Sequence, residues 1–421
     1  MRATFKWTPA AGVFLVYASI LHAQELTYTF YDLGDLGTDL YSLAADVNDA
    51  GVVVGASVPR EYIHAFMWHN GVMTDIALDF PMEKGNFGEA YSVSQTGIVA
   101  GGAVGPGGLD PPGMAVVWDR GVVTVLPVPP DCEHNWVLSR INGAGTLAVG
   151  RCMPDNGQDP LSRATVHSLV DETVQTLGPL PGFPDDASSS VQGVNDHGVA
   201  VGSFFASGLG ARAFIWSDGE MTELVNTVGG EEIVASDINN QGTIVGWAST
   251  ADAYAQGMMY KDGVMTIIGP TTARDVNERD QSVAVSIVGS ASHPILYDDG
   301  KVIDLFEFLP DYIPSSGAGG LNNYGWIVGS GDDYEDNYYM WLLVPIYDKG
   351  DYDGDGDVDH QDFQHFQRCF AAEPYIDGTL HVGCSVFDFD DDVDLDLDDY
   401  AAFQSAFTGP TAPNLNPNGP G

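Results

Sequence analysis

The chain has 421 residues, of which 44% are hydrophobic and 51 are glycine, and this apolar content excludes wholesale disorder. The 59 acidic and 15 basic side chains give a formal net charge of −44, which repels phosphate backbones and anionic lipid surfaces and excludes nucleic-acid binding. Abundant glycine and scarce lysine and arginine favour short strands joined by turns over long surface helices, so we expect a mostly β fold.

The first 23 residues have the pattern of a secretory signal peptide. Arg2 and Lys6 precede a mostly apolar run over residues 10–21, and Ala23 offers a cleavage position. The run is shorter than the roughly 20 apolar residues that a membrane span requires, and no later segment is long enough. We therefore expect an exported protein, secreted or at the cell surface, without a membrane span; a membrane anchor is the alternative.

A repeat extends over residues 26–345. Each unit contains an Asn, two residues, a Gly, a mostly apolar run and a second Gly, as first seen at residues 48–55. The seven units begin at Asn48, Ser94, Asn142, Asn195, Asn239, Asn277 and Asn322, the copies at Ser94 and Asn277 being weaker. A period near 45 residues is typical of a four-stranded propeller blade. The repeat predicts a seven-bladed β-propeller, with an open β-solenoid as the alternative.

Several units continue with a second apolar element, first seen at residues 64–68, and then with an Asn-Gly or Asp-Gly turn and a last short strand. The seventh unit lacks this turn and last strand. Residues 28–33 have the composition of the missing strand, so we predict that they complete the last blade and close the ring. The whole repeat region, residues 26–345, resembles the bacterial extracellular HAF-repeat proteins, which are named for the triplet seen here as His64, Ala65 and Phe66. That resemblance implies an exported repeat domain and no defined activity.

A different pattern, rich in aspartate, occupies residues 351–409, after a short linker over 346–350. A hard cation such as calcium needs six to eight oxygen ligands, and a sharply turned loop brings that many carboxylates together. The first predicted loop places ligands at positions 1, 3, 5, 7, 9 and 12, which are Asp351, Asp353, Asp355, Asp357, Asp359 and Asp362. The second loop repeats this spacing with Asp388, Asp390, Asp392, Asp394, Asp396 and Asp399.

Each loop is followed by aromatic residues at helical spacing, which predicts two half-hands packed face to face and stabilised in part by calcium. These aromatic residues are Phe363, Phe366 and Phe370, then Tyr400, Phe403 and Phe407. Position 6 is Gly356 in the first loop but Val393 in the second, where positive φ would cost a β-branched residue roughly 1–2 kcal/mol. We therefore expect weaker binding or altered geometry at the second site. An acidic tail without specific metal binding is the alternative.

The duplicated loop and helix pattern resembles a type I dockerin over residues 351–409. Dockerins tether exported proteins, often polysaccharide-degrading enzymes, to cohesin modules on a scaffold or cell surface, so the resemblance implies calcium binding and a cohesin-like or other surface-protein partner. Dockerins commonly carry Ser-Thr at loop positions 10 and 11. Here those positions are His360 and Gln361 in the first loop, and Leu397 and Asp398 in the second.

The chain has four cysteines, and export permits disulfides. Of the three possible connectivities, we favour the two local pairs, Cys132 with Cys152 and Cys369 with Cys384. Trp247 and Trp326 follow turns and would be able to stack on a sugar if exposed, although burial between blades is expected. The last residues, 410–421, are rich in Pro, Gly and Asn and are expected to be a disordered end.

No nucleophile elbow, zinc-binding His-Glu-x-x-His, phosphate loop or Cys-x-x-Cys pair occurs in the sequence. We therefore expect a non-enzymatic binding or scaffolding propeller whose calcium module tethers it to another protein. The first alternative is a polysaccharide-active enzyme with catalytic carboxylates on the propeller face, and the second is a structural cell-surface protein. The propeller's own ligand, a polysaccharide or a protein, is left open.

Overall fold

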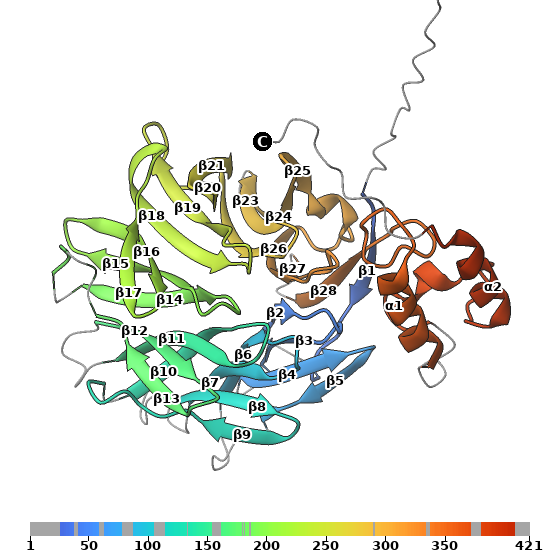
Figure 1. Cartoon of the computed structure of the whole chain (residues 1–421), viewed down its shortest axis with the longest axis horizontal. Coiled ribbons are helices and arrows are strands. Elements are labelled where there is room, and N and C mark those ends of the chain that lie inside the picture. Colours follow the sequence, from blue (N-terminus) through green and yellow to red (C-terminus); the bar gives the residue numbers. More distant parts are fainter. Residues whose placement is uncertain are drawn as a thin grey trace, which may run out of the picture.

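The computed structural model describes residues 26–37, 41–58, 63–77, 87–104, 114–132, 134–153, 161–178, 180, 182–184, 187–288, 291–333, 337–371 and 380–408. In these residues, 28 strands form seven four-stranded antiparallel sheets arranged as blades around a central axis (Figure 1). Two short α-helices belong to a small module beside the ring. The predicted mostly β, seven-bladed propeller is confirmed. The predicted signal peptide and the end over 410–421 lie outside the described residues.

The strands of each blade are given from the innermost outward. Blade 1 consists of β2 (Ser42–Val47), β3 (Val53–Ser57), β4 (His64–His69) and β5 (Val72–Asp75), blade 2 of β6 (Phe87–Val93), β7 (Val99–Val104), β8 (Met114–Asp119) and β9 (Val122–Val125), and blade 3 of β10 (His134–Ile141), β11 (Leu147–Met153), β12 (Arg163–Ser168) and β13 (Thr173–Thr176). Blade 4 consists of β14 (Ser188–Val194), β15 (Ala200–Ala206), β16 (Gly210–Ser217) and β17 (Glu220–Leu224), and blade 5 of β18 (Gly229–Ile238), β19 (Ile244–Thr250), β20 (Gln256–Lys261) and β21 (Val264–Gly269). Blade 6 consists of β22 (Thr271–Val276), β23 (Ser282–Val288), β24 (Ala291–Asp298) and β25 (Lys301–Asp304), and blade 7 of β26 (Ser315–Leu321), β27 (Ile327–Asp332), β28 (Tyr338–Pro345) and β1 (Tyr28–Asp32).

The ring closes as the sequence predicted. Strand β1 pairs with β28 in antiparallel register, with Tyr28 opposite Pro345 and Asp32 opposite Trp341. The outermost strand of blade 7 therefore comes from the start of the described chain and the other three from its later part. Because β1 and β28 pair with each other, each covers a strand edge of the other that would otherwise be exposed.

The repeated Asn forms the turn between the first two strands of a blade. In blade 1, the Asn48 side-chain oxygen accepts hydrogen bonds from the backbone N–H groups of Ala50 and Val52, at 3.1 and 3.0 Å. Gly51 has φ of 75°, a conformation that glycine adopts without steric cost. The next turn, at Asn70 and Gly71, has φ of 48° and 80°, as expected for a two-residue hairpin turn.

The same Asn side chain also joins one blade to the next, which the sequence reasoning did not foresee. The Asn48 amide donates to the Ser94 carbonyl at 2.9 Å, and the Asn322 amide donates to the Asn48 carbonyl at 3.1 Å. The equivalent amides of blades 4, 5 and 6 do the same, from Asn195 to Asn239, from Asn239 to Asn277 and from Asn277 to Asn322. In blade 3 the Asn142 amide turns instead to Thr146 of its own blade.

Apolar side chains fill the spaces between neighbouring blades. Between blades 4 and 5, for example, Val201 and Ala213 pack against Ile233, Ile244 and Met258, all buried. Comparable clusters lie between the other described blades. The apolar run of each repeat unit thus contributes to the core of the propeller.

Candidate metal centre

The C-terminal module is built on the two predicted loops. The first loop precedes helix α1 (His360–Ala371), a 3₁₀-helix, η4 (Cys384–Phe387), precedes the second loop, and helix α2 (Leu397–Ala406) follows it. The small core contains Val358, Phe366, Phe387 and Phe403. Phe366 and Phe403, from the two helices, lie 5.1 Å apart between ring centroids. The helices therefore pack face to face, while Phe370 and Phe407, at their far ends, are 46% and 38% exposed.

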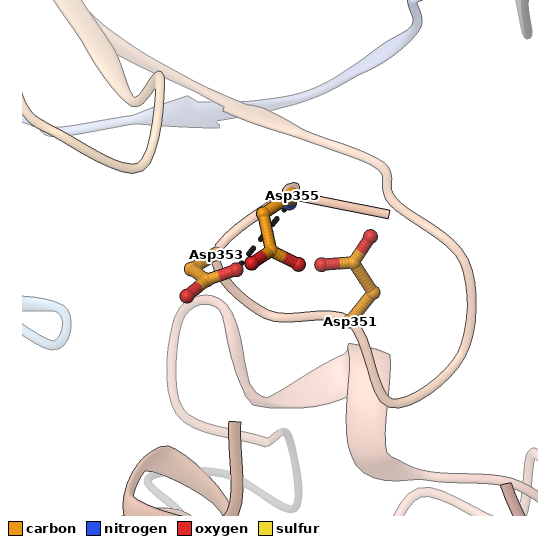
Figure 2. A group of neighbouring side chains, drawn as sticks. All are labelled: Asp351, Asp353 and Asp355. Atoms are coloured by element: carbon orange, nitrogen blue, oxygen red, sulfur yellow. Dashed lines mark hydrogen bonds between the residues drawn. The ribbon is translucent and has the colours of Figure 1, made fainter. Parts of the chain in front are cut away.

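The predicted ligands of the first loop lie close together. Asp351, Asp353 and Asp355 bring one carboxylate oxygen each to within 4.8 Å of the others, and Figure 2 shows their three side chains turned toward a common space. Asp357, Asp359 and Asp362 form a second such group. Oxygens at this spacing suit a hard divalent cation.

The second loop repeats this arrangement. Asp388 and Asp390 lie near Asp399, and Asp394 and Asp396 also lie near Asp399, each set with oxygens within 4.8 Å of one another. The structure therefore brings together, in the two loops, all of the predicted ligands except Asp392, which falls in none of these groups.

The same hydrogen bonds shape both loops. At position 1, the Asp351 carboxylate accepts from the backbone N–H of Gly356 at 3.1 Å, and Asp388 accepts from that of Val393 at the same distance. At position 12, Asp362 accepts from Tyr352 and Asp359, and Asp399 accepts from Phe389 and Asp396, at 2.6 to 2.9 Å. The carboxylate at position 12 thereby ties the start of each loop to its end.

The backbones of the two loops follow the same path, but with different residues. Positions 4 and 6 of the first loop are Gly354 and Gly356, with φ of 72° and 90°. In the second loop these positions are Asp391 and Val393, with φ of 59° and 70°. Val393 therefore adopts the positive φ that the sequence predicted, at a cost of roughly 1–2 kcal/mol.

The crowding of carboxylates disfavours their ionisation. Burial, together with repulsion from neighbouring carboxylates, raises the pKa of Asp351 to about 6 and that of Asp353 to about 7. In the second loop, burial and the neighbouring aspartates raise the pKa of Asp394, whose buried Oδ1 atom has no hydrogen-bond partner. A buried carboxylate oxygen without a partner and a cluster of like charges both fit a bound cation, which would neutralise them.

A second convergence of charge lies on the propeller axis. The Arg140 guanidinium, from the innermost strand of blade 3, reaches Asp46, Asp237 and Asp275 of three other blades at 3.5, 3.0 and 2.6 Å. A cavity of about 220 Å³ is lined by these four residues and by the repeated asparagines of the later blades. Nothing in the local sequence distinguishes Arg140 except that it is one of only 15 basic residues in the chain.

These axial carboxylates are already engaged. Asp46 accepts from the Ser92 hydroxyl and the backbone N–H of Val93, and Asp275 accepts from the backbone N–H of Leu321. Burial raises the pKa of Asp46 and Asp237. Burial alone would lower the pKa of Arg140, but the three carboxylates outweigh it and raise that pKa. The group therefore acts as a plug of one guanidinium and three carboxylates that ties four blades together.

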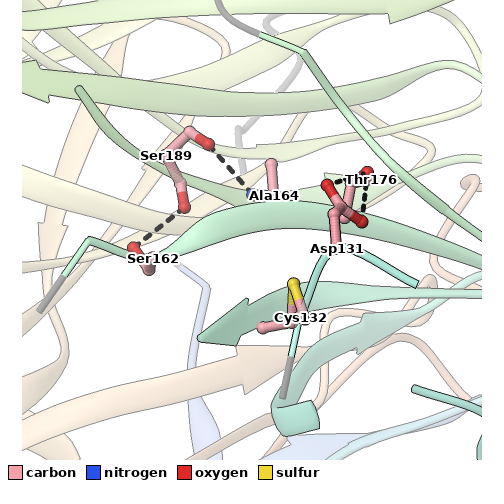
Figure 3. Close-up of a disulfide and its surroundings, with 7 residues drawn as sticks. Asp131, Cys132, Ser162, Ala164, Thr176 and Ser189 are labelled. Carbon is pink, nitrogen blue, oxygen red and sulfur yellow. Dashed lines mark hydrogen bonds between the residues drawn. A yellow bond between two sulfur atoms is a disulfide. The ribbon is translucent and has the colours of Figure 1, made fainter. Parts of the chain in front are cut away.

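Both favoured disulfides form. Cys132, in the segment after β9, is bonded to Cys152 of β11. Figure 3 shows Cys132 beside Asp131, whose carboxylate accepts a hydrogen bond from the Thr176 hydroxyl at 2.9 Å. Cys369 of α1 is bonded to Cys384 of η4. Among the described residues, no helix is long and apolar enough to cross a membrane.

No protein-family model and no curated protein sequence matches this chain. Its fold is similar to the β-propeller domain of the trilobed protease from Pyrococcus furiosus, with a TM-score of 0.46 and 10% identity over 72% of this chain and 94% of that one. It is also similar to a structure from an analysis of two prolyl endopeptidases, with a TM-score of 0.48 and 10% identity, where the match covers 72% of this chain but only 50% of that one. A mutant of the Aleuria aurantia lectin, in complex with α-methyl-L-fucoside, matches with a TM-score of 0.34 and 8% identity over 72% of this chain and 93% of the lectin. These likenesses concern the propeller fold alone.

Proposed function

We propose that the chain is an exported, non-enzymatic binding or scaffolding propeller, and that its C-terminal module binds calcium and tethers it to another protein. The observation that carries this proposal is the pair of equivalent acidic loops, whose carboxylate oxygens converge with no basic side chain among the predicted ligands. Two disulfides and the lack of a membrane-spanning helix in the described residues are consistent with a secreted protein.

The outer surface of the module supports the tethering role. Positions 10 and 11 of the loops, where the resemblance to dockerins places partner recognition, are exposed at His360, Gln361, Leu397 and Asp398. Leu397 is 72% exposed, and Phe370 and Phe407 add further exposed apolar area. An exposed apolar side chain surrounded by polar residues is suited to a protein partner. The residues at these positions differ from the common Ser-Thr pair, so we expect a partner with a surface other than that of the usual cohesin.

The test is capture of immobilised cohesin modules and other exported surface proteins by the chain without residues 1–23, in calcium and in chelator. The proposal expects at least one partner that binds only in calcium and loses binding when Leu397→Asp places a charge on the exposed face. The matched control is Val170→Asp, which adds the same charge to an exposed apolar residue on the propeller. Binding that survives both chelation and Leu397→Asp would contradict the proposal.

A polysaccharide-active enzyme is the second candidate, because three carboxylates converge on the propeller axis. Their engagement with Arg140 and backbone N–H groups argues for a structural role. The two functions separate in an assay of glycan hydrolysis by the full chain and by Asp275→Asn. Hydrolysis that the Asp275→Asn variant loses while its fold is retained would favour the enzyme, and no hydrolysis by the wild type would favour the binding propeller.

A further inference from the structure

The module is joined to the propeller through its first loop. Arg279, in the turn between β22 and β23, donates from its guanidinium to the backbone carbonyl of Asp353, position 3 of that loop, at 2.7 Å. The same guanidinium donates to the Tyr347 hydroxyl at 3.1 Å, and this hydroxyl donates to the Tyr324 carbonyl at 2.9 Å. Gly354, position 4, lies against the Tyr347 ring so closely that an added Cβ would come within 2.3 Å of it.

Position 2 of the same loop is the centre of an aromatic cluster shared by propeller and module. The Tyr352 ring stacks on His365 of α1, with centroids 4.0 Å apart, and meets Tyr324 of blade 7 edge to face at 5.2 Å. The Tyr324 hydroxyl and His365 Nε2 are hydrogen-bonded at 2.9 Å. Trp326, only 4% exposed, lies between Gly51 of blade 1 and Gly383 of the module. Three consecutive residues of the first loop, 352–354, therefore take part in the contact, together with His365 and Gly383 of the module.

The second loop is placed differently. Lys349, in the linker, donates hydrogen bonds from its ammonium group to the backbone carbonyl of Asp388 and to the carboxylate of Asp391. A cavity of about 640 Å³, lined by Trp68, Asp388 and Val393 among others, lies between this loop and blade 1. Figure 1 shows the module beside β1 and β28, at the outer edge of the ring. A change of shape in the second loop is thus taken up by the linker and by open space.

We infer that the first loop is a cation-dependent latch: a divalent cation held by this loop fixes the module on the propeller, whereas the second loop is independent of docking. This inference rests on the proposed calcium site. Six carboxylates in one loop repel one another, so the loop keeps its shape best when a cation balances them. Because residues 352–354 both complete the loop and contact blades 6 and 7, loss of that shape removes the contact. By linkage, docking strengthens cation binding by the same factor as the cation strengthens docking.

The experiment is small-angle X-ray scattering on the chain without residues 1–23, in calcium and in chelator, with two matched variants measured in calcium. Asp353→Asn removes the ligand at position 3 of the first loop but keeps the carbonyl that Arg279 contacts, and Asp390→Asn makes the same change in the second loop. The latch expects a larger radius of gyration in chelator and for Asp353→Asn, and an unchanged radius for Asp390→Asn. Equal radii for the two variants would overturn it.

Calorimetric calcium titration of the same samples separates this inference from the proposal on which it rests. Absence of any calcium binding would overturn both, whereas calcium binding with identical scattering in calcium and chelator would overturn the latch alone. If Asp353→Asn does not fold, Arg279→Ala tests the same coupling from the propeller side. We expect it to weaken the calcium affinity of the first loop about 5- to 20-fold. Lys301→Ala is the control, because Lys301 and Arg279 line the same pocket and the substitution also removes a positive charge from it. Equal affinities in these two variants would contradict the latch.

Discussion

The propeller and the module both build tight turns on a side-chain oxygen that accepts backbone N–H groups, but the propeller uses Asn and the module uses Asp. In blade 7 the Asn322 oxygen accepts from Tyr324 and Trp326, and its amide donates to the next blade. In the first loop of the module the Asp351 carboxylate accepts from Gly354 and Gly356 and has no proton to donate. A neutral amide both accepts and donates hydrogen bonds, so it joins neighbouring turns by itself. Carboxylates only accept, and crowded carboxylates repel one another until a cation binds between them.

The largest effect should come from the cluster of buried charges on the propeller axis. Arg140→Ala leaves three buried carboxylates without their cation, and removing one member of a buried ion pair costs about 3–5 kcal/mol. Guanidinium unfolding in chelator measures the change. Arg120→Ala is the control, because Arg120 is 88% exposed and forms an ion pair with its neighbour Asp119 at the surface. Equal stability of the two variants would mean that the propeller does not depend on this plug.

Removing calcium should affect the module and spare the propeller. A ligand present at 100 times its Kd stabilises the state that binds it by about 2.7 kcal/mol per site. Scanning calorimetry of the full chain should show that the unfolding temperature of the module is lower in chelator than in calcium. The unfolding temperature of the propeller should be the same in both. If both unfolding temperatures were unchanged in chelator, the module would be as independent of calcium as the propeller, and the proposed difference between them would be wrong.

Exchanging the residues at position 6 compares the two loops directly. Gly356→Val brings the strained backbone of the second loop into the first, and Val393→Gly relieves it in the second. We expect Gly356→Val to weaken calcium binding by about 1–2 kcal/mol, roughly 5- to 30-fold, and Val393→Gly to strengthen it by somewhat less, because glycine loses more freedom on folding. Titration calorimetry gives both values. A gain from Gly356→Val would show that backbone strain does not set the difference between the loops.

A smaller effect should distinguish the asparagines that join blades from the one that does not. Asn322→Ala loses both its turn and its bond to blade 1, whereas Asn142→Ala loses only bonds within its own blade. The difference should be about 1 kcal/mol, the net contribution of one hydrogen bond. Urea unfolding of the two variants measures it, and equal losses would assign the repeated Asn to the turn alone.

The stability of the calcium-free module should also depend on pH. The pKa values of Asp351 and Asp353, about 6 and about 7, lie above the ordinary value of an aspartate in the unfolded chain. The folded module therefore binds more protons, so its stability in chelator rises as the pH falls from 7 to 5. In calcium the sign reverses, because protons compete with the cation for the carboxylates. If the unfolding temperature of the module decreased as the pH was lowered in chelator as well as in calcium, this account of the loops would be contradicted.

The sequence predicted the features that depend on local spacing and on pairs of elements. Seven repeats gave seven blades, the closing strand predicted at residues 28–33 was found at residues 28–32, and the spacing of aspartates gave two loops of the same shape. Contacts between distant parts were not visible. Nothing near Arg140 indicates that its partners lie in three other blades, and nothing near Arg279 indicates that it meets Asp353, 74 residues later. The second use of the repeated Asn was also missed, because a pattern that repeats along the chain does not say what each copy contacts across a blade interface.

The most direct test of the central claim, that the paired acidic loops hold calcium, is calorimetric calcium titration of the chain without residues 1–23 and of its Asp353→Asn/Asp390→Asn double variant. The account predicts two binding events in the wild type, the weaker one belonging to the loop with Val393, and neither at comparable affinity in the double variant. No binding by the wild type, or binding that the double variant retains in full, would contradict it.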